Sequence, residues 1–197
     1  MKKSLTLLLI IVFVMAFSAC SPKPNDNKEV AEPATFKEYN GVVIKKIPGV
    51  KLAVIRCADT IANLGQNSSK LFRWLITSQS EIVGPNTAIF YRYPGNLDRD
   101  DNSTTLMYLI GIPVPKKTFG HGEVKIFDLD PYSAACILHR GPYTNIGSSY
   151  DRLLAWAMEN NKSGDNFFRE VNVSGPGPRD PVDPNKWITE IHMRLVK

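Results

Sequence analysis

The segment VKIFDLDPYSAACIL, residues 124–138, is rich in β-favouring residues and is interrupted near its middle by Pro131. This pattern predicts two β-strands that are joined by a short turn. The segment VVIKKIPGVKLAVIR, residues 42–56, has the same organisation, and its Pro48 aligns with Pro131 at an offset of 83 residues. The two segments therefore indicate an internal repeat.

A helical pattern follows each predicted strand pair. Apolar residues recur at helical spacing in residues 68–78 and again in residues 143–159. The offset of 83 residues also aligns Leu71 with Leu154, so the two helices are expected to correspond.

A second pair of strands is expected after each helix, at residues 87–93, 105–114, 166–173 and 187–196. Each half is thus predicted as β-β-α-β-β. We predict an α+β fold in which two pseudo-symmetric repeats, about 42–115 and 122–197, form a mainly antiparallel sheet with the helices on one side. The domain is expected to cover residues 36–197.

The first twenty residues have the organisation of a bacterial export signal. Lys2 and Lys3 precede a short apolar run, and Ser18 and Ala19 supply the small residues that a signal peptidase requires. The run from Phe17 to Cys20 resembles the lipobox of bacterial lipoproteins, in which the cysteine is lipidated and the signal is removed before it. We therefore expect a lipoprotein signal peptide at residues 1–19. The alternative is a plain signal peptide with an incidental cysteine.

The resemblance to a lipobox implies that lipidated Cys20 anchors the exported chain to a bacterial membrane. Residues 20–35 are polar and proline-containing, so they are expected to form a flexible tether. Ser21 stands where an aspartate often retains lipoproteins at an inner membrane, which favours an outer-membrane location in a cell with two membranes.

Charge and cysteine content exclude several classes of protein. The net charge of +5 falls to +3 when Lys2 and Lys3 leave with the signal, and this weak basic bias predicts no nucleic-acid partner.

The remaining thiols, Cys57 and Cys136, are either bonded to one another or, as we favour, free and buried. His121, His139 and His192 have no acidic or thiol partner at ligand spacing, so no metal site and no cofactor are predicted.

Two local runs carry a resemblance to a known family. The first is His139-Arg140-Gly141-Pro142-Tyr143 before the second helix, and the other comprises Phe168-Arg169-Glu170 with Trp187-Ile188-Thr189-Glu190-Ile191. With the repeat, they resemble the GyrI-like small-molecule-binding domain, which is the effector-binding domain of AraC-type and MerR-type multidrug regulators. The resemblance implies a pocket between the repeats, lined by aromatic residues and holding one buried glutamate. Some members of this family hydrolyse strained electrophiles with that glutamate and a tyrosine.

The terminal motif places the glutamate at Glu190. On a strand, Ile188, Glu190 and His192 share one face. If that face lines the pocket, a partly desolvated Glu190 would favour a cationic partner. The alternative is a solvated glutamate that is paired with a lysine or arginine. In much of the family a tyrosine follows the Arg-Glu pair after one residue, but here that position is Asn172, which weakens the expectation of hydrolysis.

Aromatic residues are expected to supply the remainder of the ligand site, because their faces suit flat or cationic molecules. Tyr91 and Tyr93 are predicted to share a strand face, and Tyr108 lies on the neighbouring predicted strand. Trp156 is expected in the core or at the pocket floor, and Trp187 at the pocket edge.

The sequence therefore favours a lipid-anchored envelope protein that binds a small amphipathic, cationic or planar molecule in a cleft between the repeats. One alternative is a hydrolase of reactive lipophilic toxins, with Glu190 as general base and Tyr91 or Tyr108 in place of the missing tyrosine. A second alternative is a structural or interaction protein of the envelope. The SOUL haem-binding proteins resemble this fold, but no haem ligand is evident in the sequence.

Overall fold

The structure is a computed structural model, and it describes residues 39–176 and 183–196. The predicted signal peptide, Cys20 and the tether lie outside these residues. All described residues belong to one compact unit, Pro33–Lys197. None of the helices in the described part has the length and apolar character that a membrane span requires.

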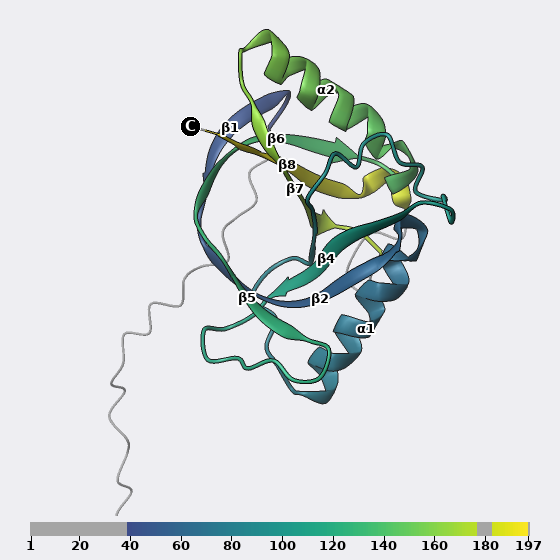
Figure 1. The fold of residues 1–197 in the computed structure, drawn as a ribbon, viewed down its shortest axis with the longest axis vertical. Helices are drawn as coiled ribbons and strands as arrows, with labels where there is room; N and C mark the ends of the chain where they lie inside the picture. The colour runs from purple at the N-terminus through teal and green to yellow at the C-terminus, as the bar shows by residue number, and fades with distance from the viewer. Residues whose placement is uncertain (1–38, 177–182, 197) are drawn as a thin grey trace, which may run out of the picture. The chain divides into compact units, whose positions relative to one another are not determined.

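Two β-β-α-β-β halves follow one another along the described chain, as the sequence predicts (Figure 1). The first half comprises β1 (Val42–Ile47), β2 (Val50–Thr60), α1 (Leu64–Thr77), β3 (Thr87–Phe90) and β4 (Thr105–Pro113). The second half comprises β5 (Lys125–Leu129), β6 (Tyr132–Arg140), α2 (Ile146–Glu159), β7 (Gly164–Ser174) and β8 (Ile188–Leu195). Short 3-10 turns lie before α1, α2 and β8, at Ile61–Asn63, Tyr143–Asn145 and Pro184–Lys186.

Helix α1 begins four residues earlier than its apolar pattern predicts. The side chain of Asp59, near the end of β2, accepts hydrogen bonds from the amides of Asn63 and Asn67, each at 2.9 Å. These bonds hold the polar first turn of α1 against the sheet. An apolar period cannot detect a turn that is stabilised in this way.

The eight described strands form one antiparallel sheet in the order β1-β6-β8-β7-β3-β4-β2-β5. If β1–β4 are exchanged with β5–β8, the result is the same strand order read from the opposite edge of the sheet. The halves are therefore related by a pseudo-twofold axis that passes between β3 and β7. The helices begin at Leu64 and Ile146, 82 residues apart rather than 83. Leu71 therefore corresponds to Leu153, which is fully buried as Leu71 is, and not to Leu154.

The two strands that flank each proline turn do not pair with one another. Strand β1 pairs with β6 of the other half, and β5 pairs with β2. Pro48 explains why β1 and β2 do not form a tight hairpin. Its fixed negative φ is incompatible with the positive φ that primed hairpin turns need at their first central position. The chain continues through Pro48 and Gly49 to a different place in the sheet. Each half thus contributes its first strand to the other.

The sheet curls, and both helices lie outside the curl (Figure 1). We call the side that α1 and α2 cover the helix face, and the opposite side the inner face. The main apolar cluster packs both helices onto the helix face through residues such as Leu71, Tyr150, Leu153 and Ile191. Two smaller apolar clusters, around Leu52 and Cys136, lie on the inner face. Both faces of the sheet are therefore buried, which makes either face a possible place for a protected polar site.

Candidate functional site

Glu190 lies on the inner face of β8 and is only 9% exposed. Its Oε1 accepts a hydrogen bond of 2.8 Å from the hydroxyl of Tyr39 and forms an ion pair with Lys45. Its Oε2 lies 3.0 Å from Nε2 of His192. Burial opposes ionisation of Glu190, but its bonds with His192, Lys45 and Tyr39 outweigh that effect and lower its pKa to about 2. The carboxylate is therefore already matched by groups of this chain.

His192 is buried beside Glu190, and the burial lowers its pKa, so we treat the ring as neutral. Nδ1 of His192 lies 2.9 Å from the hydroxyl of Tyr132. The tautomer that satisfies both contacts carries its proton on Nε2, donates to Glu190 and accepts from Tyr132. The ring is thus fixed from both sides.

The predicted aromatic residues do not gather around Glu190. Tyr108 is buried on the helix face, where its hydroxyl accepts from Asn67 at 2.9 Å and contacts the carbonyl of Thr60 at 3.3 Å. Trp156 packs at the edge of the same apolar cluster. Trp187 stacks on Tyr143, with ring centroids 5.1 Å apart. The predicted ligand-binding set is therefore divided between separate parts of the domain.

Tyr91 and Tyr93 lie on different sides of the sheet, contrary to the strand alternation predicted for them. Strand β3 ends at Phe90, so the regular alternation stops before it reaches them. Tyr91 is 50% exposed and meets the edge of Phe167, a residue of the inner face. Tyr93 instead packs edge-on against Tyr150 and Phe168 on the helix face, and its hydroxyl donates to Asp151 at 2.9 Å.

A second buried glutamate, Glu170, lies on the opposite face of the sheet from Glu190. It lies on the helix face of β7 and is 2% exposed. Its Oε1 accepts a hydrogen bond of 2.8 Å from the hydroxyl of Tyr150. The same oxygen forms an ion pair with Arg99, which lies in the connection between β3 and β4. We call this group the Glu170 site, and it comprises Phe90, Tyr93, Arg99, Tyr150, Phe168 and Glu170.

The Glu170 site lies where the two halves meet. Phe90 ends β3 and Glu170 is on β7, the two strands beside the pseudo-twofold axis, and Tyr150 descends from α2. The guanidinium of Arg99 lies 5.8 Å from the centroid of the Phe90 ring. A buried carboxylate among aromatic rings at the junction of the repeats matches what the family resemblance implies, but with a different glutamate.

The charges of the Glu170 site depend on one another. Burial alone would lower the pKa of Arg99, but Glu170 and the neighbouring tyrosines more than offset it and raise that pKa. Burial and Glu170 both raise the pKa of Tyr150, so its hydroxyl keeps its proton and donates. Nε of Arg99 is buried without a hydrogen-bond partner among the described residues. The site therefore holds a cation against one carboxylate and several aromatic rings.

The run Phe168-Arg169-Glu170 is part of the family resemblance, but the sequence predicted no role for Glu170. One signal was present: residues two apart share a strand face, so Glu170 lies on the same side as the apolar Phe168. The identity of its partner could not be predicted, because Arg99 reaches the site from an irregular segment 71 residues earlier.

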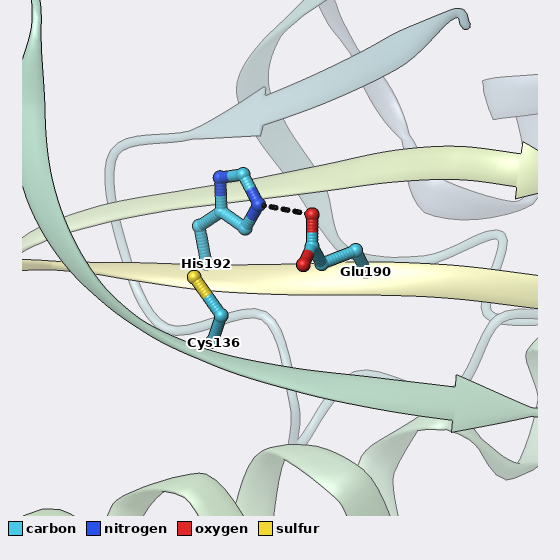
Figure 2. Close-up of side chains that lie close together, drawn as sticks. All are labelled: Cys136, Glu190 and His192. Carbon is cyan, nitrogen blue, oxygen red and sulfur yellow. Dashed lines mark hydrogen bonds and ion pairs between the residues drawn. The ribbon is translucent and has the colours of Figure 1, made fainter. Parts of the chain in front are cut away.

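The sequence predicted that His192 has no thiol or acidic partner, but the fold brings both to it. Atoms of Cys136, Glu190 and His192 all lie within 4.8 Å of one another (Figure 2). Cys136 on β6 is directly opposite His192 on β8 in the sheet register. Cys57 and Cys136 are both free and buried, as favoured from the sequence.

The sequence of residues 80–196, more than half of the chain, matches the family described as the GyrI-like small molecule binding domain. No curated protein sequence matches the chain significantly.

Solved structures share the fold at low sequence identity. The structure of EcmrR in its complex with DNA matches with a TM-score of 0.67 and 16% sequence identity. The match covers 79% of this chain and 57% of the EcmrR chain, so this chain spans little over half the length of EcmrR. A hydrolase from Listeria innocua matches with a TM-score of 0.59 and 11% identity over 84% and 96% of the two chains. SAV2435 bound to tetraphenylphosphonium matches with a TM-score of 0.53 and 9% identity over 79% and 93%. At these identities the likeness concerns the fold alone.

Proposed function

Because the chain belongs to the GyrI-like small-molecule-binding family, we propose that it binds a small lipophilic or planar cation at the Glu170 site. The observation that carries the proposal is the position of Arg99, whose guanidinium is held by the Glu170 carboxylate beside the Phe90 ring. A ligand cation would take the place of this guanidinium. The ligand in the SAV2435 structure, tetraphenylphosphonium, is a cation with four aromatic groups and has the chemistry that such a site would accept.

The buried ion pair makes the site selective for cations. Removing Arg99 without a replacement would leave Glu170 charged and unpaired, and breaking such a buried pair costs about 3–5 kcal/mol. A cationic ligand restores the pairing, whereas a neutral ligand of the same shape does not. We therefore propose that charge, more than shape, selects the ligand.

Titration of the full chain with tetraphenylphosphonium, followed by calorimetry, tests the proposal. We expect Glu170→Gln to weaken binding about 100-fold, since it removes the buried charge. Arg99→Met keeps an apolar stem near Phe90 but removes the competing cation, so binding should tighten about tenfold or more.

The matched control is Glu190→Gln, which should leave the affinity unchanged. The proposal is wrong if Glu190→Gln abolishes binding while Glu170→Gln does not, because the glutamate predicted from the terminal motif would then be the anchor. It is also wrong if the wild-type chain and Arg99→Met both fail to bind, provided that thermal unfolding shows both to be folded.

Hydrolysis of a reactive lipophilic compound is a second candidate, and one contact favours it. The predicted pairing of Glu190 with Tyr91 or Tyr108 does not occur, but Glu170 and the Tyr150 hydroxyl lie 2.8 Å apart. This pair could exchange a proton with a bound electrophile once Arg99 has withdrawn. Turnover of a strained electrophile that survives Tyr150→Phe unchanged would contradict this role.

For location, we propose that Cys20 is lipidated and that the domain is exported, with the outer membrane favoured where there is one. The run from Phe17 to Cys20 after an apolar segment supports this proposal. Labelling of cells with a fatty-acid analogue should mark the wild-type chain and not Cys20→Ser.

A further inference from the structure

We propose that Cys136, Glu190 and His192 form a binding site for a divalent transition metal of the zinc type. This site is on the inner face of the sheet and does not depend on the function proposed for the helix face. The candidate ligand atoms are Sγ of Cys136, Oε2 of Glu190 and Nε2 of His192, and the three groups all approach within 4.8 Å of one another. A single ion bound at about 2.0–2.3 Å from each ligand atom fits a group of this size after small side-chain adjustments.

Regular strand geometry holds the three side chains together. Glu190 and His192 are two residues apart on β8 and therefore share a face. Cys136 faces His192 across the β6–β8 ladder (Figure 2). All three side chains are buried and come from β6 and β8, which each have a paired strand on both sides. A site built on paired strands keeps its ligands in place better than one built on loops.

The donor set indicates the class of metal. One sulfur, one imidazole nitrogen and one carboxylate oxygen suit zinc and the neighbouring ions of the first transition row, whereas magnesium and calcium prefer oxygen alone. Three protein ligands leave a fourth position for water or an exogenous ligand, as in open zinc sites.

Neighbouring groups already orient two of the three ligands. Tyr132 is hydrogen-bonded to Nδ1 of His192 at 2.9 Å, on the side away from Glu190. Tyr39 and Lys45 both contact Oε1 of Glu190, which leaves Oε2 directed toward His192. Such outer contacts set the tautomer and direction of metal ligands.

The proton balance of metal binding is simple. The ion bonds to the Cys136 sulfur and displaces the thiol proton to solvent. The neutral His192 ring changes tautomer, so that its proton moves from Nε2 to Nδ1 and the Nε2 lone pair can bind the metal. The Tyr132 hydroxyl keeps its own proton, rotates it away from the ring, and accepts a hydrogen bond from Nδ1–H. Thiolate and carboxylate together then neutralise the charge of a divalent ion. No oxidant or reductant is required.

Two cationic side chains face the site and oppose the metal charge. Lys45 is bound to Glu190, but a third of its side chain is exposed, so it can turn toward solvent and open a path for the ion. Arg169 lies opposite His192 on β7, and its Nε donates to the hydroxyl of Thr87 at 2.9 Å, which holds it beside the site.

A nucleophilic cysteine is a poorer interpretation of the same group. Both ring nitrogens of His192 are occupied by Glu190 and Tyr132, so neither activates the thiol. Sγ of Cys136 instead donates to the carbonyl oxygen of Ala134 at 3.8 Å.

Titration of the purified full chain with cobalt(II) alone tests the proposal. We expect saturation at one equivalent with a thiolate-to-cobalt charge-transfer band in the near ultraviolet, and zinc should displace the cobalt and remove the band. The band should be lost in Cys136→Ser and kept in Cys57→Ser and Cys20→Ser, which serve as matched thiol controls. Tyr132→Phe should keep the band but weaken cobalt binding by about 10–100-fold.

The proposal is overturned if the wild-type chain gives no band at one equivalent, and this result needs no variant to fold. It is equally overturned if the band persists in Cys136→Ser or disappears in Cys57→Ser. Circular dichroism of each variant without metal separates lost ligation from lost structure, and His192→Gln provides a second ligand variant that should also bind cobalt at least about tenfold more weakly.

Discussion

At the scale of single residues, two buried glutamates divide the chemistry of this domain between the two faces of one sheet. Glu190 is matched by Lys45 and lies beside a thiol and an imidazole, whereas Glu170 is matched by Arg99 and lies among aromatic rings. Each carboxylate is buried and paired, as buried charges must be. The difference in their neighbours is the basis for proposing a metal at Glu190 and an organic cation at Glu170.

The buried side chain of His139 contributes to the dependence of stability on pH. Nδ1 of His139 lies 3.0 Å from the hydroxyl of Ser149, and Nε2 lies 3.0 Å from the carbonyl oxygen of Pro142. Burial, as the largest effect, lowers its pKa below the ordinary value of 6.5. The unfolded chain therefore takes up a proton before the folded one, and stability present above pH 6.5 is lost as the pH falls below it, by at most about 1.4 kcal/mol per pH unit.

We predict that His139→Gln flattens this dependence. Urea unfolding at pH 7.5 and pH 5.5 should show a smaller difference for the variant than for the wild type. His121→Gln is the control, since His121 is exposed, and it should keep the wild-type difference. An unchanged difference in His139→Gln would show that other groups cause the loss.

At the scale of elements, the connection between β3 and β4 brings the guanidinium of Arg99 to the Glu170 site. This segment carries Arg99, and it approaches α2 closely at Gly95. A side chain added at Gly95 would place its Cβ 2.5 Å from Cβ of Tyr150, and one added at Gly147 would lie 2.8 Å from the Gly95 carbonyl oxygen. The two glycines thus allow the connection to rest on the helix.

We predict that Gly95→Ala displaces this connection from α2 and loosens Arg99. Its unfolding free energy should fall by about 1–3 kcal/mol, as for other overpacked contacts, and amide exchange should increase in residues 91–104. The matched control is Gly65→Ala in α1, where no atom lies within 4 Å of the added Cβ. That change should stabilise the domain by about 0.5–1 kcal/mol. Equal effects of both substitutions would contradict the close contact at Gly95.

At the scale of the whole domain, the exchange of β1 and β5 makes the two halves interdependent. The first strand of each half pairs only with a strand of the other half: β1 pairs with β6, and β5 pairs with β2. The central pair of β3 and β7 also joins the halves through the sheet. Neither half can complete its own part of the sheet alone.

We therefore predict a single cooperative unfolding transition. Tryptophan fluorescence reports on Trp74 in the first half and on Trp156 and Trp187 in the second. Its urea midpoint should coincide with that of far-ultraviolet circular dichroism. A fragment of residues 39–121, which contains all strands of the first half, should remain unfolded or aggregate through its unpaired edges. Two separated transitions, or a folded fragment, would contradict this interdependence.

The sequence alone determined the elements, the repeat and the family. Proline-broken strand segments and helical periods depend on residues near one another, and Trp187-Ile188-Thr189-Glu190-Ile191 is a local motif, so both could be recognised without a structure. Alternation along β8 also placed Glu190 and His192 on one face.

Only the tertiary structure decided which of those faces meet. Strand alternation says that Glu190 and Ile191 point in opposite directions, but it does not say which side the helices cover or which strand lies alongside. The register that brings Cys136 to His192, and the reach of Arg99 to Glu170, depend on contacts between residues far apart in the chain. Such contacts follow from the packing of the complete sheet, and for that reason the sequence alone could not show that Glu170 is buried against Arg99 and Tyr150.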